Sequence, residues 1–160
     1  MDMADEGVIA RIEAAPFRRW MGVGIVATLA ALVAYLAIEM PWHLPRQAAM
    51  LIGAAVILWF AVAMQRATGL VLVLTETELR DSSGAVLARV ADIVRVERGL
   101  LAFKPSNGFV ITLSEPVGRV WKPGLWWRMG RRVGVGGVLP AGQSKAMADM
   151  LAAMLVERKG

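Results

Sequence analysis

The sequence contains no cysteine and a single histidine among its 160 residues. Without cysteine the chain can form neither a disulfide bond nor a thiolate metal site, and it is compatible with a cytoplasmic domain. The lone histidine, His43, completes neither a zinc site nor a Ser-His-Asp triad. These absences leave few routes to metal or nucleophilic chemistry.

Catalytic and nucleotide-binding motifs are also missing. The carboxylates show no spaced pair for acid–base catalysis, and no serine lies in a G-x-S-x-G motif. Gly130, Gly134, Gly136 and Gly137 match neither the dinucleotide fingerprint nor the P-loop, and "VLPAG" follows them where a phosphate-binding loop would open a helix. We therefore predict that the protein is not an enzyme and that it binds no cofactor and no metal.

Long uncharged segments, by contrast, are prominent. The chain is 57% hydrophobic, whereas soluble domains are roughly 45–50% apolar. The excess lies in residues 20–38 and 48–64, neither of which contains a charge. As helices they would each cover about 25–30 Å, the thickness of a bilayer core. Buried core helices are the alternative, but so short a chain has little protein to cover them. We predict a transmembrane hairpin over residues 20–66.

The charges beside these segments predict their orientation. Two prolines and Trp42 in "EMPWHLPRQ" indicate a short interfacial loop, so both chain ends lie on one side. That loop carries only Arg46. The basic residues next to the other ends of the spans are Arg11, Arg18, Arg19 and Arg66. The positive-inside rule then predicts a multi-pass inner-membrane protein with both termini in the cytoplasm, residues 1–19 forming a cytoplasmic segment. The first span is too long for a typical cleaved signal peptide.

From about residue 69 onward, short β-rich segments replace the helical pattern. "LVLVL" is followed by "TELRDSSGAVLARV", which indicates strand, turn and strand with the turn at residues 81–84. Further strands are expected in "DIVRVERG", "LLAFK", "GFVITLS", "VGRVWK" and "RRVGVGGVL", where the glycines allow a bend or bulge. We predict six or seven short antiparallel strands.

An amphipathic helix is expected at the end of the chain, over about residues 143–158. Its apolar stripe follows the helical spacing i, i+3, i+4, i+7, i+8 and comprises Met147, Met150, Leu151, Met154 and Leu155. Ser144 is a suitable N-cap. Core packing is the expected role of the methionines.

Two spans followed by "LTETELRDSSGAVLARVADIVRVERG" and a terminal helix resemble small bacterial membrane proteins with a pleckstrin-homology-like (PH-like) domain. The resemblance covers roughly residues 69–158 and lies in element order and strand rhythm. It implies a bent antiparallel sheet, or partial barrel, capped by the C-terminal helix, in a cytoplasmic binding domain over residues 69–160. Headgroup-binding members carry basic residues around the first hairpin, whereas the turn at residues 75–78 is acidic here.

One basic and aromatic cluster suggests a binding surface. Its members are Arg119, Trp121, Lys122, Trp126, Trp127, Arg128, Arg131 and Arg132, and no acidic residue interrupts them. Lysine and arginine attract anionic headgroups, and tryptophan favours the membrane interface. Tryptophan and arginine also anchor protein partners. A proline-glycine turn whose tryptophans cover the end of the sheet is the structural alternative. Nucleic-acid binding is not expected.

These observations predict a non-enzymatic, membrane-anchored binding or scaffolding module. Its partners would be membrane lipids, and a protein partner or a second copy of the chain remains open. The alternative is an accessory subunit that packs against a larger membrane complex through its two helices, whose many small residues permit close contact.

Overall fold

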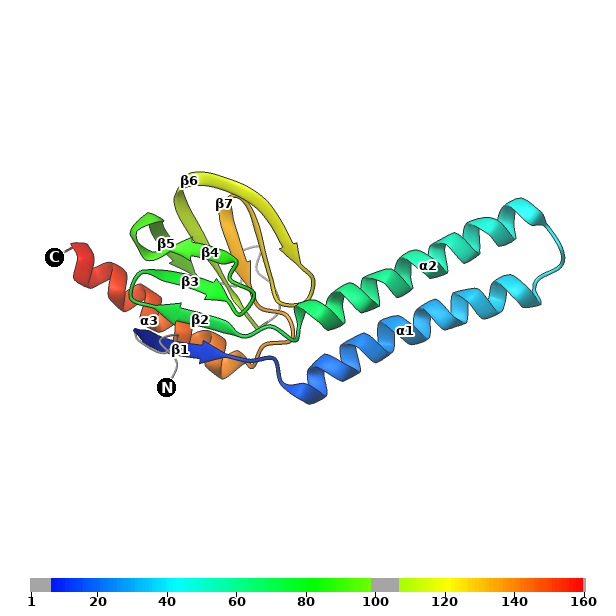
Figure 1. Ribbon diagram of the computed structural model, residues 1–160, viewed down its shortest axis with the longest axis horizontal. Helices are drawn as coiled ribbons and strands as arrows, with labels where there is room; N and C mark the ends of the chain where they lie inside the picture. The colour runs from blue at the N-terminus through cyan, green and yellow to red at the C-terminus, as the bar shows by residue number, and fades with distance from the viewer. Residues whose placement is uncertain (1–6, 99–106, 160) are drawn as a thin grey trace.

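A helical hairpin projects from one end of a small β domain in the computed structural model, which describes residues 7–98 and 107–159 (Figure 1). The hairpin consists of α1 (Pro16–Glu39) and α2 (Leu44–Ala67). The predicted spans, residues 20–38 and 48–64, lie within these helices. At about 1.5 Å per residue, each 24-residue helix is about 36 Å long. Both helices are long and apolar enough to cross a membrane.

Proline shapes the ends of the hairpin. Pro16 opens α1 and Pro45 lies in the first turn of α2, where a missing N–H leaves no helical bond unmade. The carbonyl of Pro41 in the loop accepts a hydrogen bond of 2.7 Å from Arg46. The two helices pack along their length, and the buried residues on them are small: Ala30, Ala37, Ala54, Ala61 and Ala67.

Most of the hairpin surface is not covered by protein. In the most apolar 18-residue stretch of each helix, only 11% of the residues are buried. A core helix of a soluble protein would instead be largely covered by its own domain. The arrangement therefore differs from the pair of core helices considered as an alternative, and it leaves a large apolar surface exposed.

The β domain contains two antiparallel sheets. The first has the order β1-β2-β3-β4, from β1 (Val8–Ile12), β2 (Leu72–Thr75), β3 (Glu78–Asp81) and β4 (Val86–Arg89). A single 3-10 turn, η1 (Val90–Asp92), leads to the second sheet, β5-β6-β7, from β5 (Ile93–Glu97), β6 (Phe109–Lys122) and β7 (Trp126–Val135). The helix α3 (Ala141–Lys159) packs mainly against β5. Among the described residues the sheets do not close into a barrel.

The strand β1 was not expected from the sequence. It lies before the helical hairpin, yet it pairs with β2 in the register Ile12↔Leu72 and Arg11↔Val73. The side chain of Ile12 belongs to the core of the domain. The segment "VIARI" is only five residues long, and its partner strand β2 follows both helices in the sequence. Local periodicity therefore gave no reason to place this segment in a sheet.

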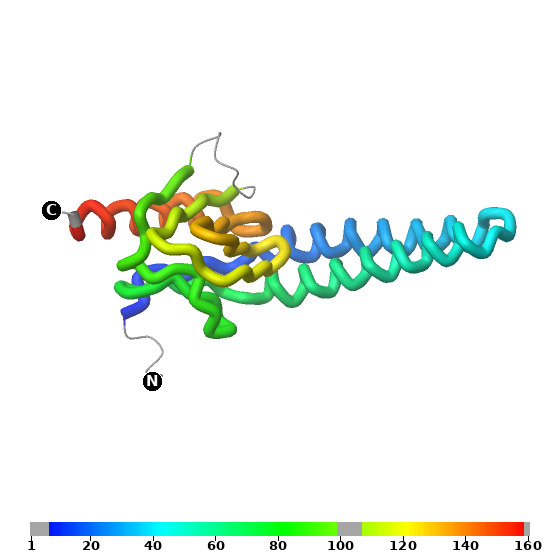
Figure 2. The backbone as a smooth tube through the Cα atoms, turned by 90° about the horizontal axis from the view of Figure 1, so that it is seen from above, coloured from blue at the N-terminus to red at the C-terminus, as the bar shows by residue number. Residues whose placement is uncertain are grey.

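The helical hairpin therefore forms the connection between two neighbouring strands. Residues 13–15 join β1 to α1, and residues 68–71 join α2 to β2. Figure 2 shows both helices leaving the same end of the domain. The acidic turn at residues 75–78 joins β2 to β3. The resemblance to PH-like proteins predicted that this turn is the first connection of the sheet, but it is the second.

Some strand and helix boundaries differ from those predicted from the sequence. "GFVITLS" and "VGRVWK" form one 14-residue strand, β6, instead of two strands. The segment "LLAFK" lies outside the described residues. The helix α3 begins at Ala141, so Ser144 lies inside its first turn, where its N–H donates to the Pro140 carbonyl. The prediction that Ser144 is the N-cap is therefore wrong.

The core fills the space between the sheets and α3. Its α3 residues are Met147, Ala148, Leu151 and Leu155, with Met154 packed at the edge. Met150, expected on the same stripe, is exposed because the buried face of α3 is narrower than the apolar pattern. The core packing expected of the methionines holds for Met147.

The variant Ile12→Ala should lower the free energy of unfolding of the β domain by about 2–5 kcal/mol, because it opens a cavity where Ile12 is only 1% exposed. The matched control is Ile9→Ala on the same strand, where the side chain is 40% exposed and the loss should stay below about 1 kcal/mol. Urea unfolding of the full chain in detergent, followed by near-UV circular dichroism, measures both. Equal losses would contradict the packing of β1 in the core.

Candidate functional site

The strands β6 and β7 extend past their neighbour as a two-stranded ribbon. The strand β5 pairs with β6 only between Val110 and Leu113. Beyond this point β6 pairs with β7 alone, from Val117↔Gly130 to Lys122↔Trp126. Two register shifts, between Thr112 and Val117 and between Val117 and Val120, allow the ribbon to bend, and Val117 and Val120 still pack against the core. Most of the predicted cluster therefore lies on one projecting element.

A tight turn closes the ribbon at residues 122–125. The Leu125 N–H donates to the Lys122 carbonyl at 3.1 Å. Pro123 and Gly124 occupy the two central positions, and Gly124 has a φ of 79°. Proline followed by a glycine with positive φ is the pattern of a type II turn. The proline-glycine turn expected from the sequence is thus present.

This turn lies against the last turns of α2 (Figure 1). A Cβ atom added to Gly124 would stand 3.1 Å from Thr68 and 3.3 Å from Met64. Further out, the rings of Trp121 and Phe60 are 5.7 Å apart at an interplanar angle of 32°. Phe60 precedes the end of α2 by about two helical turns. The ribbon tip therefore reaches about 10 Å along the helical hairpin.

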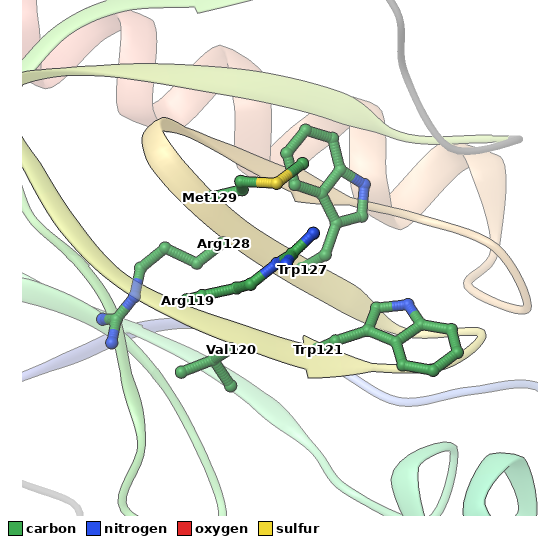
Figure 3. A pocket seen from close by; sticks show the side chains of 6 residues that line it. All are labelled: Arg119, Val120, Trp121, Trp127, Arg128 and Met129. Atoms are coloured by element: carbon green, nitrogen blue, oxygen red, sulfur yellow. The ribbon is translucent and has the colours of Figure 1, made fainter.

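The ribbon divides the predicted cluster between two faces. Strand alternation and the register Trp121↔Trp127 place Arg119, Trp121, Trp127 and Met129 on one face, which we call the ribbon face. Trp121 and Met129 are 56% and 51% exposed. Val120 and Arg128 point to the other side (Figure 3). These six residues line an open groove of about 390 Å³, so the ribbon face offers indole, thioether and guanidinium groups to a neighbouring surface.

Trp126 has a structural role instead. It is 1% exposed, and its Nε1 donates to Asp81 Oδ2 at 3.1 Å. The other carboxylate oxygen of Asp81 accepts from the backbone N–H groups of Ser83 at 2.9 Å and Ala85 at 3.1 Å. A buried carboxylate is stable only when its oxygens are hydrogen-bonded. The pair therefore joins the turn end of the ribbon to the β3–β4 turn.

Arg128 also supports the fold. Its Nε donates to the Gly118 carbonyl at 2.9 Å within the ribbon, and an Nη donates to the Val86 carbonyl on β4. These bonds hold the ribbon against the other sheet. Arg119, Arg131 and Arg132 are exposed. Of the predicted cluster, the structure therefore places Trp126 in the core and Arg128 between the sheets, and it leaves the others at the surface.

The glycines of β7 serve packing. A Cβ atom on Gly134 would lie 2.3 Å from the indole of Trp127, so glycine at this position leaves room for the ring where it lies. Gly137, with a φ of 91°, approaches the Gly124 carbonyl so closely that a Cβ atom would be 2.4 Å from its oxygen. The bend expected within the last strand lies directly after β7, at residues 137–139. Gly134 makes room for Trp127, and Gly137 packs on the ribbon turn.

Cations gather where the hairpin meets the domain. Arg18 donates to the Leu139 carbonyl at 3.4 Å, and Arg19 donates to the Gln65 carbonyl at 3.1 Å. Arg66 is exposed near the end of α2. These bonds fasten α1 both to the β domain and to α2, and they place the charges expected beside the spans at the domain end of the hairpin.

A second groove, missed by the sequence analysis, lies at this junction. It has a volume of about 510 Å³ and separates the last turns of α2 from the ribbon tip. We call it the junction groove; it is lined by Trp59, Val62, Ala63, Arg66, Ala67, Leu70, Trp121, Lys122 and Pro123. The groove forms only where the ribbon packs beside α2, so no local sequence pattern predicts it. A tryptophan near the end of an apolar run, Trp59, was the one local sign of a special surface.

Comparison with protein-family models, with curated proteins and with solved structures finds no match to this chain. Within residues 7–98 and 107–159, no group of three or more histidine, cysteine or carboxylate side chains is placed to hold a metal ion.

The variant Trp126→Phe should lower the free energy of unfolding by about 1–3 kcal/mol, because it leaves the buried Asp81 carboxylate without one hydrogen-bond donor. Trp121→Phe is the control, since Trp121 is more than half exposed and its indole makes no hydrogen bond to another described residue. Its effect should stay within about 0.5 kcal/mol. Chemical unfolding of the full chain compares the two. A larger loss for Trp121→Phe would reverse the assignment of structural and surface roles.

Proposed function

We propose that this protein is a non-enzymatic binding module of the bacterial inner membrane. In this proposal α1 and α2 span the bilayer, and both termini and the β domain lie in the cytoplasm. The ribbon face then contacts anionic lipid headgroups of the inner leaflet. The observation that carries the proposal is the position of the ribbon tip, which lies beside the last two turns of α2 with Trp121 against Phe60.

The exposed aromatic residues support a membrane-spanning orientation. Trp20 and Trp59 lie near the domain end of the hairpin, and Tyr35 and Trp42 lie near its loop. Tryptophan and tyrosine favour the two interfaces of a bilayer. Between these levels the helices expose leucine, isoleucine and valine side chains, which suit the hydrocarbon core.

The placement of charge supports the cytoplasmic side for the domain. Arg18, Arg19 and Arg66 lie at the domain end, whereas the loop between the helices carries Arg46. An excess of basic residues marks the cytoplasmic side of short loops. The first and last described elements, β1 and α3, both belong to the domain, so both ends of the chain would lie on the same side.

The division into four strands, three strands and a C-terminal helix supports a PH-like domain. Headgroup-binding members of that family carry basic residues around their first hairpin. Here the first two strands are connected by the helical hairpin, and its base carries Arg18, Arg19 and Arg66. The same end of the domain would thus face the membrane, held by helices in addition to charge. The acidic turn at residues 75–78 does not count against this orientation, because it joins β2 to β3.

Membrane contact of the ribbon follows from this geometry. The connections at residues 13–15 and 68–71 are short, and Gly124 packs on Thr68, so the ribbon tip is held at the level of the α2 end. Anionic headgroups attract each nearby lysine or arginine by about 1 kcal/mol. The exposed Arg119, Arg131 and Arg132 would add this attraction to the interfacial preference of Trp121.

An accessory-subunit role is the second candidate. Small side chains leave a shallow apolar groove of about 310 Å³ between the helices, lined by Ala27, Ala30, Ala31, Ala34, Leu51, Ala54, Ala55 and Leu58. Small residues permit a further helix to pack closely in a membrane. This role would use the hairpin, whereas the first candidate uses the ribbon face.

The topology can be tested directly because the chain has no cysteine. Single variants His43→Cys and Glu76→Cys place a thiol in the helix loop and at the far end of the domain. A membrane-impermeant maleimide added to spheroplasts should label His43→Cys at once and Glu76→Cys only after the membrane is permeabilised. Labelling of Glu76→Cys in intact spheroplasts would place the domain outside the cytoplasm and contradict the proposal.

The contact of the ribbon face is tested with an environment-sensitive fluorophore on Met129→Cys in the full chain, reconstituted in lipid nanodiscs. We expect a blue-shifted emission in anionic nanodiscs that returns toward the aqueous value in neutral nanodiscs or high salt. The same label on Glu76→Cys, at the end of β2 away from the helices, is the control. A Met129→Cys signal that never differs from this control would exclude headgroup contact and leave the accessory-subunit role.

A further inference from the structure

We infer that the junction groove binds a single anionic phospholipid, with its phosphate between Arg66 and Lys122 and the first part of an acyl chain against Trp59 and Trp121. The inference deepens the proposed function and depends on α1 and α2 lying in a bilayer. It goes beyond headgroup contact of the ribbon face, because it assigns a bounded site with a polar end and an apolar end.

The two walls of the groove come from distant parts of the chain. Trp59, Val62, Ala63 and Arg66 are spaced i, i+3, i+4 and i+7, which places them on one face of α2. Opposite them stands the ribbon tip with Trp121, Lys122 and Pro123. The contact of Trp121 with Phe60 keeps the tip in place. A volume of about 510 Å³ leaves room for a headgroup and part of one chain.

The chemistry of the walls changes along the helix axis. Arg66 lies one residue before the end of α2, whereas Trp59 lies about 10 Å deeper along the hairpin. The cations are therefore at the domain end, and the aromatic and aliphatic side chains extend toward the middle of the hairpin. A phospholipid in the inner leaflet has the same order, with its phosphate at the surface and its chains below.

The exposed surface in the groove suits a lipid better than water. Trp59 is 64% exposed and Trp121 is 56% exposed, so both present large apolar rings. The lining holds two cations and no carboxylate, as far as the described residues show. The ion pairs found in these residues, Arg80–Glu78, Arg95–Glu97 and Arg98–Asp149, all lie elsewhere. An anion between Arg66 and Lys122 would supply the opposite charge.

The occupant is a phospholipid and not a soluble anion, because more than half of the lining residues are apolar. An anionic headgroup is favoured over a zwitterionic one, since the two cations leave a net positive charge after a single phosphate is bound. Phosphatidylglycerol and phosphatidylcholine with identical chains are therefore the matched probes. They differ in headgroup charge and share the phosphate.

The test is native mass spectrometry of the full chain released from nanodiscs that contain both lipids. We expect one phosphatidylglycerol to be retained in preference to phosphatidylcholine. The double variant Arg66→Gln, Lys122→Gln should weaken retention about 30-fold. Arg89→Gln, Lys145→Gln removes the same charge from exposed positions outside both the groove and the ribbon, and it should retain lipid as the unmodified chain does. Equal loss in both double variants would overturn the site.

A second variant blocks the chain end without changing charge. Val62→Trp fills the apolar part of the groove and should abolish retention, whereas Val56→Trp, at an exposed position on the same helix outside the groove, should not. Unfolding midpoints equal to that of the unmodified chain establish that the variants fold. Retention of lipid by folded Val62→Trp, or displacement of the lipid by excess inorganic phosphate, would contradict the inference.

The two proposals fail in different ways. If the Met129→Cys fluorophore responds to anionic lipid while the Arg66, Lys122 variant retains phosphatidylglycerol normally, the junction groove is overturned and headgroup contact of the ribbon stands. If the fluorophore does not respond while retention depends on Arg66 and Lys122, the ribbon contact is overturned and the lipid site stands.

Discussion

The pairing of β1 with β2 is the interaction on which the rest of the structure depends. The two strands are neighbours in one sheet, although the whole helical hairpin separates them in the sequence. Because they run antiparallel, with Ile12 opposite Leu72, the chain leaves the sheet and returns to it at the same end. Only residues 13–15 and 68–71 lie between the strands and the helices, so the hairpin is attached to the domain at two adjacent points and not through one flexible linker.

The long β6–β7 ribbon turns this attachment into a shared surface. It continues past β5 until its turn packs on Thr68 and Met64, and the glycines at its bends permit the close approaches. The buried pair of Trp126 and Asp81 holds its turn end, and Arg128 connects it to β4. Residues that look alike in the sequence therefore differ in the structure: some fix the ribbon, and the others lie at the surface.

If the hairpin spans a membrane as we propose, the domain has a physical advantage in binding the membrane surface. A soluble domain loses translational and rotational freedom each time it binds, whereas a domain tied to spanning helices has already lost it. In the proposed arrangement, weak contacts from a few arginines and tryptophans would then be sufficient to hold the ribbon at the headgroups. The proposed lipid site would extend this principle, because its two walls come from the anchor and from the domain and would join them through the bound lipid.

The sequence by itself determined those features that depend on local composition. Uncharged runs specify the two apolar helices, because length and hydropathy are properties of a contiguous segment. Period-two segments indicated β2 to β5, and the stripe of Met147, Leu151 and Leu155 indicated α3. The basic and aromatic cluster was visible as well. The tertiary structure alone decided which of its members are exposed, since burial of Trp126 requires Asp81 from a distant strand. It also decided the place of β1, the packing of the ribbon beside α2 and the existence of the junction groove, because each requires contact between segments that no local pattern connects.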